Sequence, residues 1–163
     1  MPWRGSRSII EPFRIIRTAP QHLGAIPFQI ARHEVRKVMG PGLAELKAAL
    51  AAQGVAALGP WFTHHLRPPG EIFDFEICLP VAAPIASLGR VQAAQWPAMR
   101  MARTAYHGGF EGLGPAWGEF LAQLAGAGHK TRDDLYEVYA IGPETSADPA
   151  MWRTELSKPL VET

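Results

Sequence analysis

Cysteine is nearly absent from this chain, because Cys78 is the only one among 163 residues. A single cysteine forms no intrachain disulfide, so the sequence excludes a secreted fold that disulfides hold together. Long apolar runs are missing as well, since no stretch approaches the roughly 20 apolar residues that cross a bilayer. The N-terminal residues also lack the apolar core of a signal peptide. These absences predict a cytoplasmic protein that has no membrane partner.

A large excess of charge of either sign is also missing. Sixteen Lys and Arg residues face fifteen Asp and Glu residues, so the net charge is +1. Proteins that hold the nucleic-acid backbone need a broad basic surface, and only the first residues, with Arg4, Arg7, Arg14 and Arg17, are locally basic. About ten residues precede the first expected strand, which is too few for a helix-turn-helix. We therefore expect no direct binding of nucleic acid.

The chain has no pattern typical of a metal or cofactor site. Its six histidines show no ligand spacing, and the adjacent His64 and His65 would point to opposite faces of a strand. No Gly-rich phosphate loop, Ser-centred elbow or calcium loop appears. We predict no metal and no cofactor. Cys78 lies in an apolar strand pattern and is best interpreted as a buried small hydrophobe.

The chain does contain an internal repeat. "GPGLAELKAALAAQG" (40–54) and "GPAWGEFLAQLAGAG" (114–128) align at an offset of 74 with seven of fifteen positions identical. Both segments have helical spacing of apolar residues, a proline suited to a first turn and a glycine suited to a C-terminal stop. The same offset aligns "WFTHHL" (61–66) with "LYEVYA" (135–140). After a five-residue insertion, "DFEICLP" (74–80) matches "RTELSKP" (153–159).

These elements predict an α+β fold of two β-α-β-β repeats, each with a further strand at its start. Repeat one covers about residues 9–81, a linker about 82–89 and repeat two about 90–160, all within a single domain, 1–163. A pseudo-two-fold axis would relate the repeats. We expect an antiparallel sheet backed by two main helices, with a groove between the repeats.

One expected strand carries a charge among apolar residues. "DDLYEVYAIG" (133–142) has the residue types of a half-buried strand, and Glu137 and Tyr139 share one face of it. Either the strand lies at a sheet edge, where Glu137 meets water or an arginine such as Arg103 or Arg132, or Glu137 faces the groove. A buried carboxylate without a partner is costly and has its pKa raised. In the groove Glu137 would therefore await a cation or act as a general base.

Aromatic residues gather around this position in the predicted fold. Trp61 and His65 have the matching parity in the first repeat, and together with Tyr139 they would form a box that attracts cations or stacks on planar compounds. Ordinary core packing is the alternative for Trp61 and Tyr139, and it is the favoured one for Trp117. Lesser candidates for the groove are Tyr106, Phe110, Trp117 and Trp152. The glycines at 108 and 109 favour a turn there.

The chain resembles the GyrI-like small-molecule-binding domain, also called the AraC-type effector-binding domain. The resemblance rests on "YHGGFEGLGPAW" (106–117), "LYEVYAIGPET" (135–145), "DPAMWRTELSKPL" (148–160) and "FDFEICLPV" (73–81), and it extends from about Glu11 to Leu160. It implies a double β-α-β-β fold whose groove binds bulky aromatic or cationic compounds, with a glutamate of the second repeat inside it. Here the matching residue is Glu137. The chain departs from the family at Ser157 and Lys158, where relatives often have an aromatic residue.

Two functions follow from the residues and the resemblance. The first is a stand-alone protein that binds or sequesters bulky aromatic or cationic compounds, as in multidrug binding, toxin resistance or transcription regulation through a partner. The second is a hydrolase in which Glu137 activates water to open cyclopropane-bearing genotoxins, with Tyr139 or Tyr106 holding the water or the leaving oxygen. Binding is favoured, because no second catalytic group has a recognisable spacing. The resemblance implies a regulator or a gyrase-like protein as partner, and it leaves a homodimer open.

Overall fold

The computed structural model describes residues 8–162. Its elements follow the chain in the order β1 (Arg14–Arg17), β2 (Gln21–Ala31), η1 (Arg32–Glu34), α1 (Val35–Ala52), β3 (Phe62–His65), β4 (Ile72–Val81), β5 (Gln92–Trp96), β6 (Arg100–His107), η2 (Phe110–Gly112), α2 (Leu113–Gly126), β7 (Leu135–Ile141), η3 (Pro149–Met151) and β8 (Arg153–Pro159). No helix of these residues is long and apolar enough to cross a membrane. The predicted α+β class is confirmed.

All eight strands form one antiparallel sheet in the order β1-β6-β8-β7-β3-β4-β2-β5. The order is symmetric about the central β3–β7 pair. Going outward, β4, β2 and β5 on one side correspond to β8, β6 and β1 on the other. Thr63 of β3 pairs with Glu137 of β7, and these two residues are also equivalent under the 74-residue offset. A two-fold axis through this pair would relate the halves. The boundaries at 9–81 and 90–160 stay a prediction.

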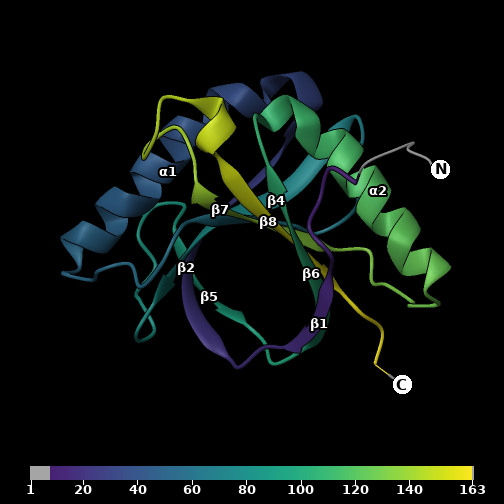
Figure 1. Ribbon diagram of the computed structural model, residues 1–163. Coiled ribbons are helices and arrows are strands. Elements are labelled where there is room, and N and C mark those ends of the chain that lie inside the picture. Colours follow the sequence, from purple (N-terminus) through teal and green to yellow (C-terminus); the bar gives the residue numbers. More distant parts are fainter. Residues whose placement is uncertain (1–7, 163) are drawn as a thin grey trace.

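The first strand of each half pairs with the other half. β1 lies against β6, whereas β5 lies against β2. This exchange ties the two halves together at both edges of the sheet as well as at its centre. The sheet curves strongly, and β1 and β5 are its two edge strands (Figure 1). The local residue pattern predicts that such strands exist but not which partner each one takes.

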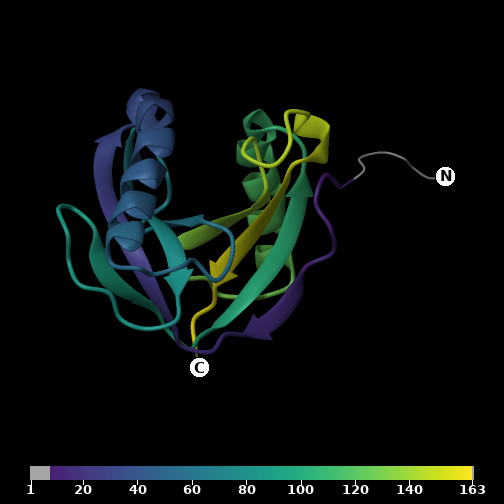
Figure 2. The same cartoon turned by 90° about the vertical axis from the view of Figure 1, so that its left-hand side faces the viewer.

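Both main helices cover the same face of the sheet (Figures 1 and 2). α1 buries Leu43, Leu46 and Leu50 in a core cluster with residues of β2 and β4. α2 buries Trp117, Phe120 and Leu124 in a second cluster with residues of β6, β7 and β8. Each helix thus has its own core, and Figure 2 shows the two helices standing side by side over the two halves of the sheet.

Helix α1 starts earlier than the sequence predicts. The Gly-Pro pair suggested a first turn at Pro41, but α1 begins at Val35 and Pro41 lies in its interior. The missing amide leaves the carbonyl of Lys37 without its helical partner, and Lys37 is exposed to water. Val35 and Val38 pack against the core and favour the longer helix. In α2, Pro115 does lie in the first turn, and Gly54 and Gly128 adopt the positive φ angles expected just beyond the helix ends.

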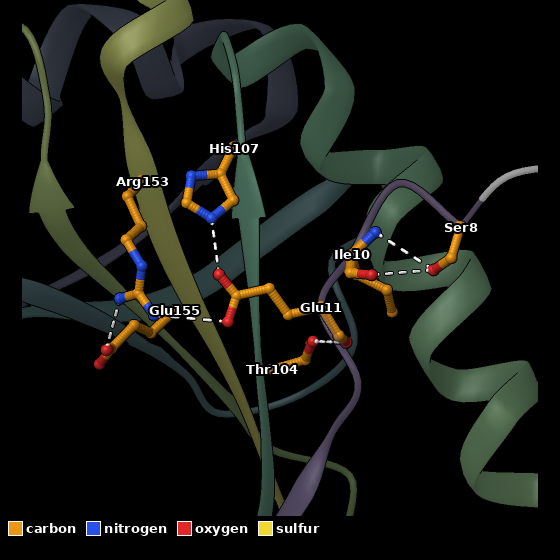
Figure 3. Close-up of polar contacts among 7 residues, drawn as sticks. All are labelled: Ser8, Ile10, Glu11, Thr104, His107, Arg153 and Glu155. Carbon is orange, nitrogen blue, oxygen red and sulfur yellow. Dashed lines mark hydrogen bonds and ion pairs between the residues drawn. The ribbon is translucent and has the colours of Figure 1, made fainter.

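The segment before β1 is fastened to β6 and β8 on the outside of the sheet (Figure 3). Glu11 bonds to His107 Nε2 at 2.7 Å and pairs with Arg153 at 3.7 Å. Thr104 donates to the Glu11 carbonyl, and Arg153 also pairs with Glu155 at 2.7 Å. The hydrogen bond from His107 is the main cause that lowers the pKa of Glu11. These contacts fix the start of the described chain against the second half.

The face of the sheet away from the helices is not the solvated surface that the sequence suggested. In the sequence, Asp74 and Glu76 alternate with Phe73, Phe75 and Ile77, which predicts that the two acids lie in water. Their side chains are only 19% and 24% exposed. The curvature encloses this face, and Phe62, Cys78 and Trp96 belong to a third apolar cluster there. The prediction for the two acids is therefore wrong, whereas that of a buried Cys78 is confirmed.

Candidate functional site

A cleft of about 1020 Å³ lies between the two main helices and has the centre of the sheet as its floor. We call it the interhelical cleft. Its walls come from α1 and η1 on one side and from α2, η2 and the loop before β8 on the other. Its volume is at the upper end of the range typical of small-molecule sites. The two halves of the chain contribute one wall each.

The floor is ordered in rows that the strand register sets. Residues of one parity on β3, β7 and β8 point to the helix side, and cross-strand partners lie next to one another. Thr63, Glu137 and Leu156 form the middle row. Toward one end follow His65 and Leu135; toward the other, Tyr139 and Thr154. Glu137 therefore lies at the middle of the floor, where the symmetric strand order places the two halves in contact.

Glu137 receives a hydrogen bond on each carboxylate oxygen. The Trp117 indole donates to Oε2 at 2.7 Å, and the Tyr139 hydroxyl donates to Oε1 at 2.8 Å. The Tyr139 oxygen also lies 2.9 Å from the Thr63 hydroxyl, which donates because the tyrosine proton is already used. The side chains of Trp117, Tyr139 and Thr63 are all neutral. None of the ion pairs among residues 8–162 involves Glu137. The two arginines that the sequence suggested as its partners bind elsewhere: Arg103 donates to the Ser157 hydroxyl, and Arg132 pairs with Asp134.

Burial raises the pKa of Glu137, and the hydrogen bonds from Tyr139 and Trp117 offset only part of that shift. The carboxyl group is thus held in place by two donors but lacks a positive charge beside it. A cation placed in the cleft would stabilise the ionised form, whereas an empty cleft favours the neutral acid. The same carboxylate raises the pKa of Tyr139 further, after burial as the larger cause.

Aromatic rings enclose one end of the floor. The Trp61 and Tyr139 rings lie 4.4 Å apart, and Phe110 approaches Tyr139 edge-on at 5.7 Å. Phe110 also contacts Trp152 at 4.8 Å. Trp61 Nε1 donates to Glu144 at 3.1 Å, which fixes the indole at the cleft wall. All four rings line the interhelical cleft.

The structure brings most of the predicted site residues together. Glu137, Tyr139, Trp61, His65, Phe110, Trp117 and Trp152 all line the cleft. Trp117 is both a core residue and a cleft residue. It is 8% exposed within the apolar cluster of the second half, and its indole donates to Glu137. Tyr106 does not reach the cleft. It is buried beneath the turn before α2, where its hydroxyl donates to the Gly109 carbonyl at 2.9 Å.

His65 is uncharged at neutral pH. Burial, and to a lesser extent the neighbouring His64, lowers its pKa to about 4. Its ring stacks on Phe75 at 5.3 Å, and within residues 8–162 its Nδ1 atom has no hydrogen-bond partner. His65 therefore adds a neutral aromatic surface to the cleft and no positive charge.

Two polar features escaped the sequence reasoning. On the far face of the sheet, His64 bonds to Asp134 at 2.8 Å and to Glu76 at 3.3 Å, and its ring stacks on Tyr136 at 4.1 Å. On the cleft side, Lys158 is 4% exposed and donates to the Asp134 carbonyl at 3.0 Å. Both sets join residues that are distant in the sequence, so only the strand register reveals them. The adjacent histidines do point to opposite faces, as predicted.

Known proteins resemble this chain in structure and not in sequence. No family model and no curated protein matches it. EcmrR in complex with DNA superposes with a TM-score of 0.84 at 17% identity, over 96% of this chain and 59% of EcmrR. The EcmrR C-terminal domain alone gives 0.81 at 18% identity, over 93% and 98%. SAV2435 bound to tetraphenylphosphonium gives 0.63 at 11% identity, over 93% and 94%.

These likenesses establish the fold. The chain has the fold of the GyrI-like effector-binding domain, which confirms the predicted resemblance at that level. It spans about three fifths of the DNA-bound protein and nearly all of that protein's C-terminal domain.

Proposed function

We propose that this protein binds bulky aromatic cations in the interhelical cleft, with Glu137 as their counter-charge. The observation that carries the proposal is the hydrogen-bonding of Glu137: two neutral donors hold a carboxylate that has no basic partner within residues 8–162. A partly buried negative charge without a countercharge is costly to the free protein. A bound cation removes that cost.

The aromatic end of the cleft supports the same ligand class. Trp61 and Tyr139 lie in contact beside Glu137, and Phe110 and Trp152 extend the aromatic surface along the wall. Each ring face attracts a cation by about 0.5–2 kcal/mol. The likeness to SAV2435, which was solved with tetraphenylphosphonium, agrees with an aromatic cation of this size. We therefore favour binding or sequestration of such compounds.

Substitution of Glu137 by glutamine tests the proposal. Glutamine keeps both contacts, because its amide oxygen can accept from Trp117 while its amide nitrogen donates to the Tyr139 oxygen, whose proton then turns to Thr63. Only the charge is removed. We expect tetraphenylphosphonium to bind Glu137→Gln about ten- to a hundredfold more weakly than wild type, as measured by calorimetric titration.

The exposed Glu71 provides the control, since Glu71→Gln makes the same change of charge outside the cleft. Its affinity should equal that of wild type. Equal affinity of wild type and Glu137→Gln would refute a countercharge role for Glu137.

A second function deserves a test because the same two residues resemble a general base and its donor. Glu137, whose pKa is raised by burial, could take a proton from water while Tyr139 holds the attacking oxygen. The hydroxide would then add to an activated cyclopropane carbon as the ring bond breaks, and the released electron pair would move into the conjugated carbonyl. Incubation with a cyclopropane-bearing alkylator, followed by mass spectrometry, distinguishes ring-opened product from unchanged bound compound.

A further inference from the structure

The charges that line the interhelical cleft are separated along its length. The acidic residues Glu111 and Glu144 belong to the aromatic end: Glu144 accepts from the Trp61 indole, and Glu111 follows Phe110, which contacts Tyr139. The basic residues Arg32, Arg36 and Lys158 also line the cleft. Lys158 lies at the opposite end by its strand register, Arg32 by its contact with the segment before β4, and Arg36 follows one turn later in α1.

Two pairings locate this basic end. Lys158 comes directly after Ser157, the partner of Tyr136, so it lies beside Leu135 in the row of His65. Arg32 donates its amide to the Glu71 carbonyl, just before the start of β4, and β4 passes His65 at Phe75. Since His65 is neutral, the positive charge at this end comes from Lys158 and the two arginines.

Lys158 is the strongest feature of the basic end. Its residue is 96% buried by the surrounding chain, and its ammonium group donates to one protein acceptor, the Asp134 carbonyl. An ammonium has three N–H donors. Burial lowers the pKa of Lys158, and the nearby charges of Asp134 and Asp133 counteract that shift. A buried ammonium with unused donors is as costly as a buried carboxylate without a countercharge.

Lys158 and Glu137 do not neutralise each other. Neither belongs to any ion pair among residues 8–162, and the two lie on neighbouring strands, two residues apart in register. That spacing corresponds to about 7 Å along the strands. Arg32 and Arg36 are exposed at the mouth and likewise form no ion pair within the described chain. The cleft therefore holds a fixed negative and a fixed positive group at a distance that one small molecule can span.

We propose that the preferred ligands are zwitterionic: an aromatic cation that lies against Glu137 and carries an acidic group, such as a carboxylate, which reaches Lys158. The inference rests on the proposed binding of aromatic cations in the same cleft. It assigns Lys158 as the residue that selects among them. A simple cation satisfies one end of the cleft, whereas a zwitterion satisfies both.

A matched pair of ligands tests the proposal. (4-Carboxybutyl)triphenylphosphonium and its methyl ester share the cation and the arm, and they differ in the carboxylate. We expect wild type to bind the acid at least about fivefold more tightly than the ester in calorimetric titrations. Lys158→Met keeps the length of the side chain without its charge and should bring the ratio close to one. Lys158→Arg should keep most of the preference.

The outcomes separate this proposal from the proposed function. Ester binding by Lys158→Met shows that the variant is folded, and Lys130→Met, at an exposed position outside the cleft, should behave as wild type. An acid-to-ester ratio near one in wild type, with both compounds bound, overturns the role of Lys158 and leaves cation binding intact. If neither compound binds wild type, the proposed function itself fails.

Discussion

Glu137 shows how a single residue can reduce the stability of the fold in favour of a ligand. Its pKa is raised by burial, so the folded state holds the proton more tightly than the unfolded state does. The resulting stability is present at low pH and is lost as the pH rises through the raised pKa. At neutral pH the empty cleft therefore carries a cost, which a bound cation offsets.

His64 provides the opposite case, a titrating residue that stabilises the free protein. Burial alone lowers its pKa, but the hydrogen bonds that His64 makes to the Asp134 and Glu76 carboxylates, together with the negative charges of these groups, outweigh burial and raise it. For Asp134, burial raises the pKa, but the hydrogen bond from His64 together with the positive charges of His64 and Arg132 outweighs burial, so the pKa is lowered. The pair links β3 to the segment before β7 across the two halves of the chain.

We predict that His64→Gln destabilises the protein in a defined pH window. The raised pKa of His64 contributes stability that is lost as the pH rises through it; the lowered pKa of Asp134 contributes stability that is lost as the pH falls through it. The loss should therefore be largest between the ordinary values of 3.8 for Asp and 6.5 for His. Urea unfolding should show a loss of about 1–3 kcal/mol there.

His107→Gln is the matched control, because the His107 side chain is 54% exposed and its contact with Glu11 lies at the surface. A surface pair of this kind contributes about 0–1 kcal/mol. An equal loss for His64→Gln at every pH would attribute the effect to the stacking on Tyr136 and not to charge.

Single residues were predicted from the sequence to different extents. Glu137, Tyr139, Trp61 and His65 were assigned to one face because the alternation of a strand is local, and each half could be aligned with the other. Lys158 and Asp134 meet only through the pairing of β7 with β8, which local patterns do not determine. Tyr106 was a lesser candidate for the groove because it precedes the turn at Gly108 and Gly109, and in the structure its hydroxyl serves that turn by donating to the Gly109 carbonyl.

Among the elements, α1 depends on close contact with the sheet at Gly42. A β-carbon there would lie 2.8 Å from Ile77 Cδ1 and 2.9 Å from Phe28 Cζ. Phe28 is itself stacked on Phe75 at 5.5 Å and has little room to move. The glycine thus sets the distance between α1 and the sheet, and through it the position of one wall of the interhelical cleft.

We therefore expect Gly42→Ala to destabilise the protein by about 1–3 kcal/mol, because overpacking outweighs the better helix propensity of alanine. Gly118→Ala in α2 is the matched control, since a β-carbon there meets no atom within 4 Å. It should stabilise by about 0.5–1 kcal/mol. Thermal unfolding of both variants without ligand measures the difference, and a stabilised Gly42→Ala would show that α1 shifts freely on the sheet.

The elements themselves were largely predictable, with one instructive error. Apolar spacing and the Gly stops located both helices, but the Gly-Pro pair that truly opens α2 was also used to start α1. In α1 the apolar residues Val35 and Val38 extend the helix toward its N-terminus. Tertiary packing there outweighs the local preference of proline for a first turn.

For the whole molecule, the sequence repeat predicted the class of fold, and three-dimensional pairing decided the rest. The exchange of β1 and β5 between the halves and the curvature of the sheet enclose the far face, which is why Asp74 and Glu76 are not solvated. The pairing of β1 with β6 and of β5 with β2 also ties the two halves together near both edges of the sheet. The cleft between α1 and α2 is thereby present in the free protein.

A crystal structure with tetraphenylphosphonium tests the central claim most directly. We predict that the ligand lies in the interhelical cleft with its rings against Trp61 and Tyr139 and its phosphorus on the side of Glu137, while the two hydrogen bonds to Glu137 persist. Calorimetry on the same sample should give one site per chain. A ligand bound elsewhere, for example beside Trp96 on the far face of the sheet, with an empty cleft, would contradict the account.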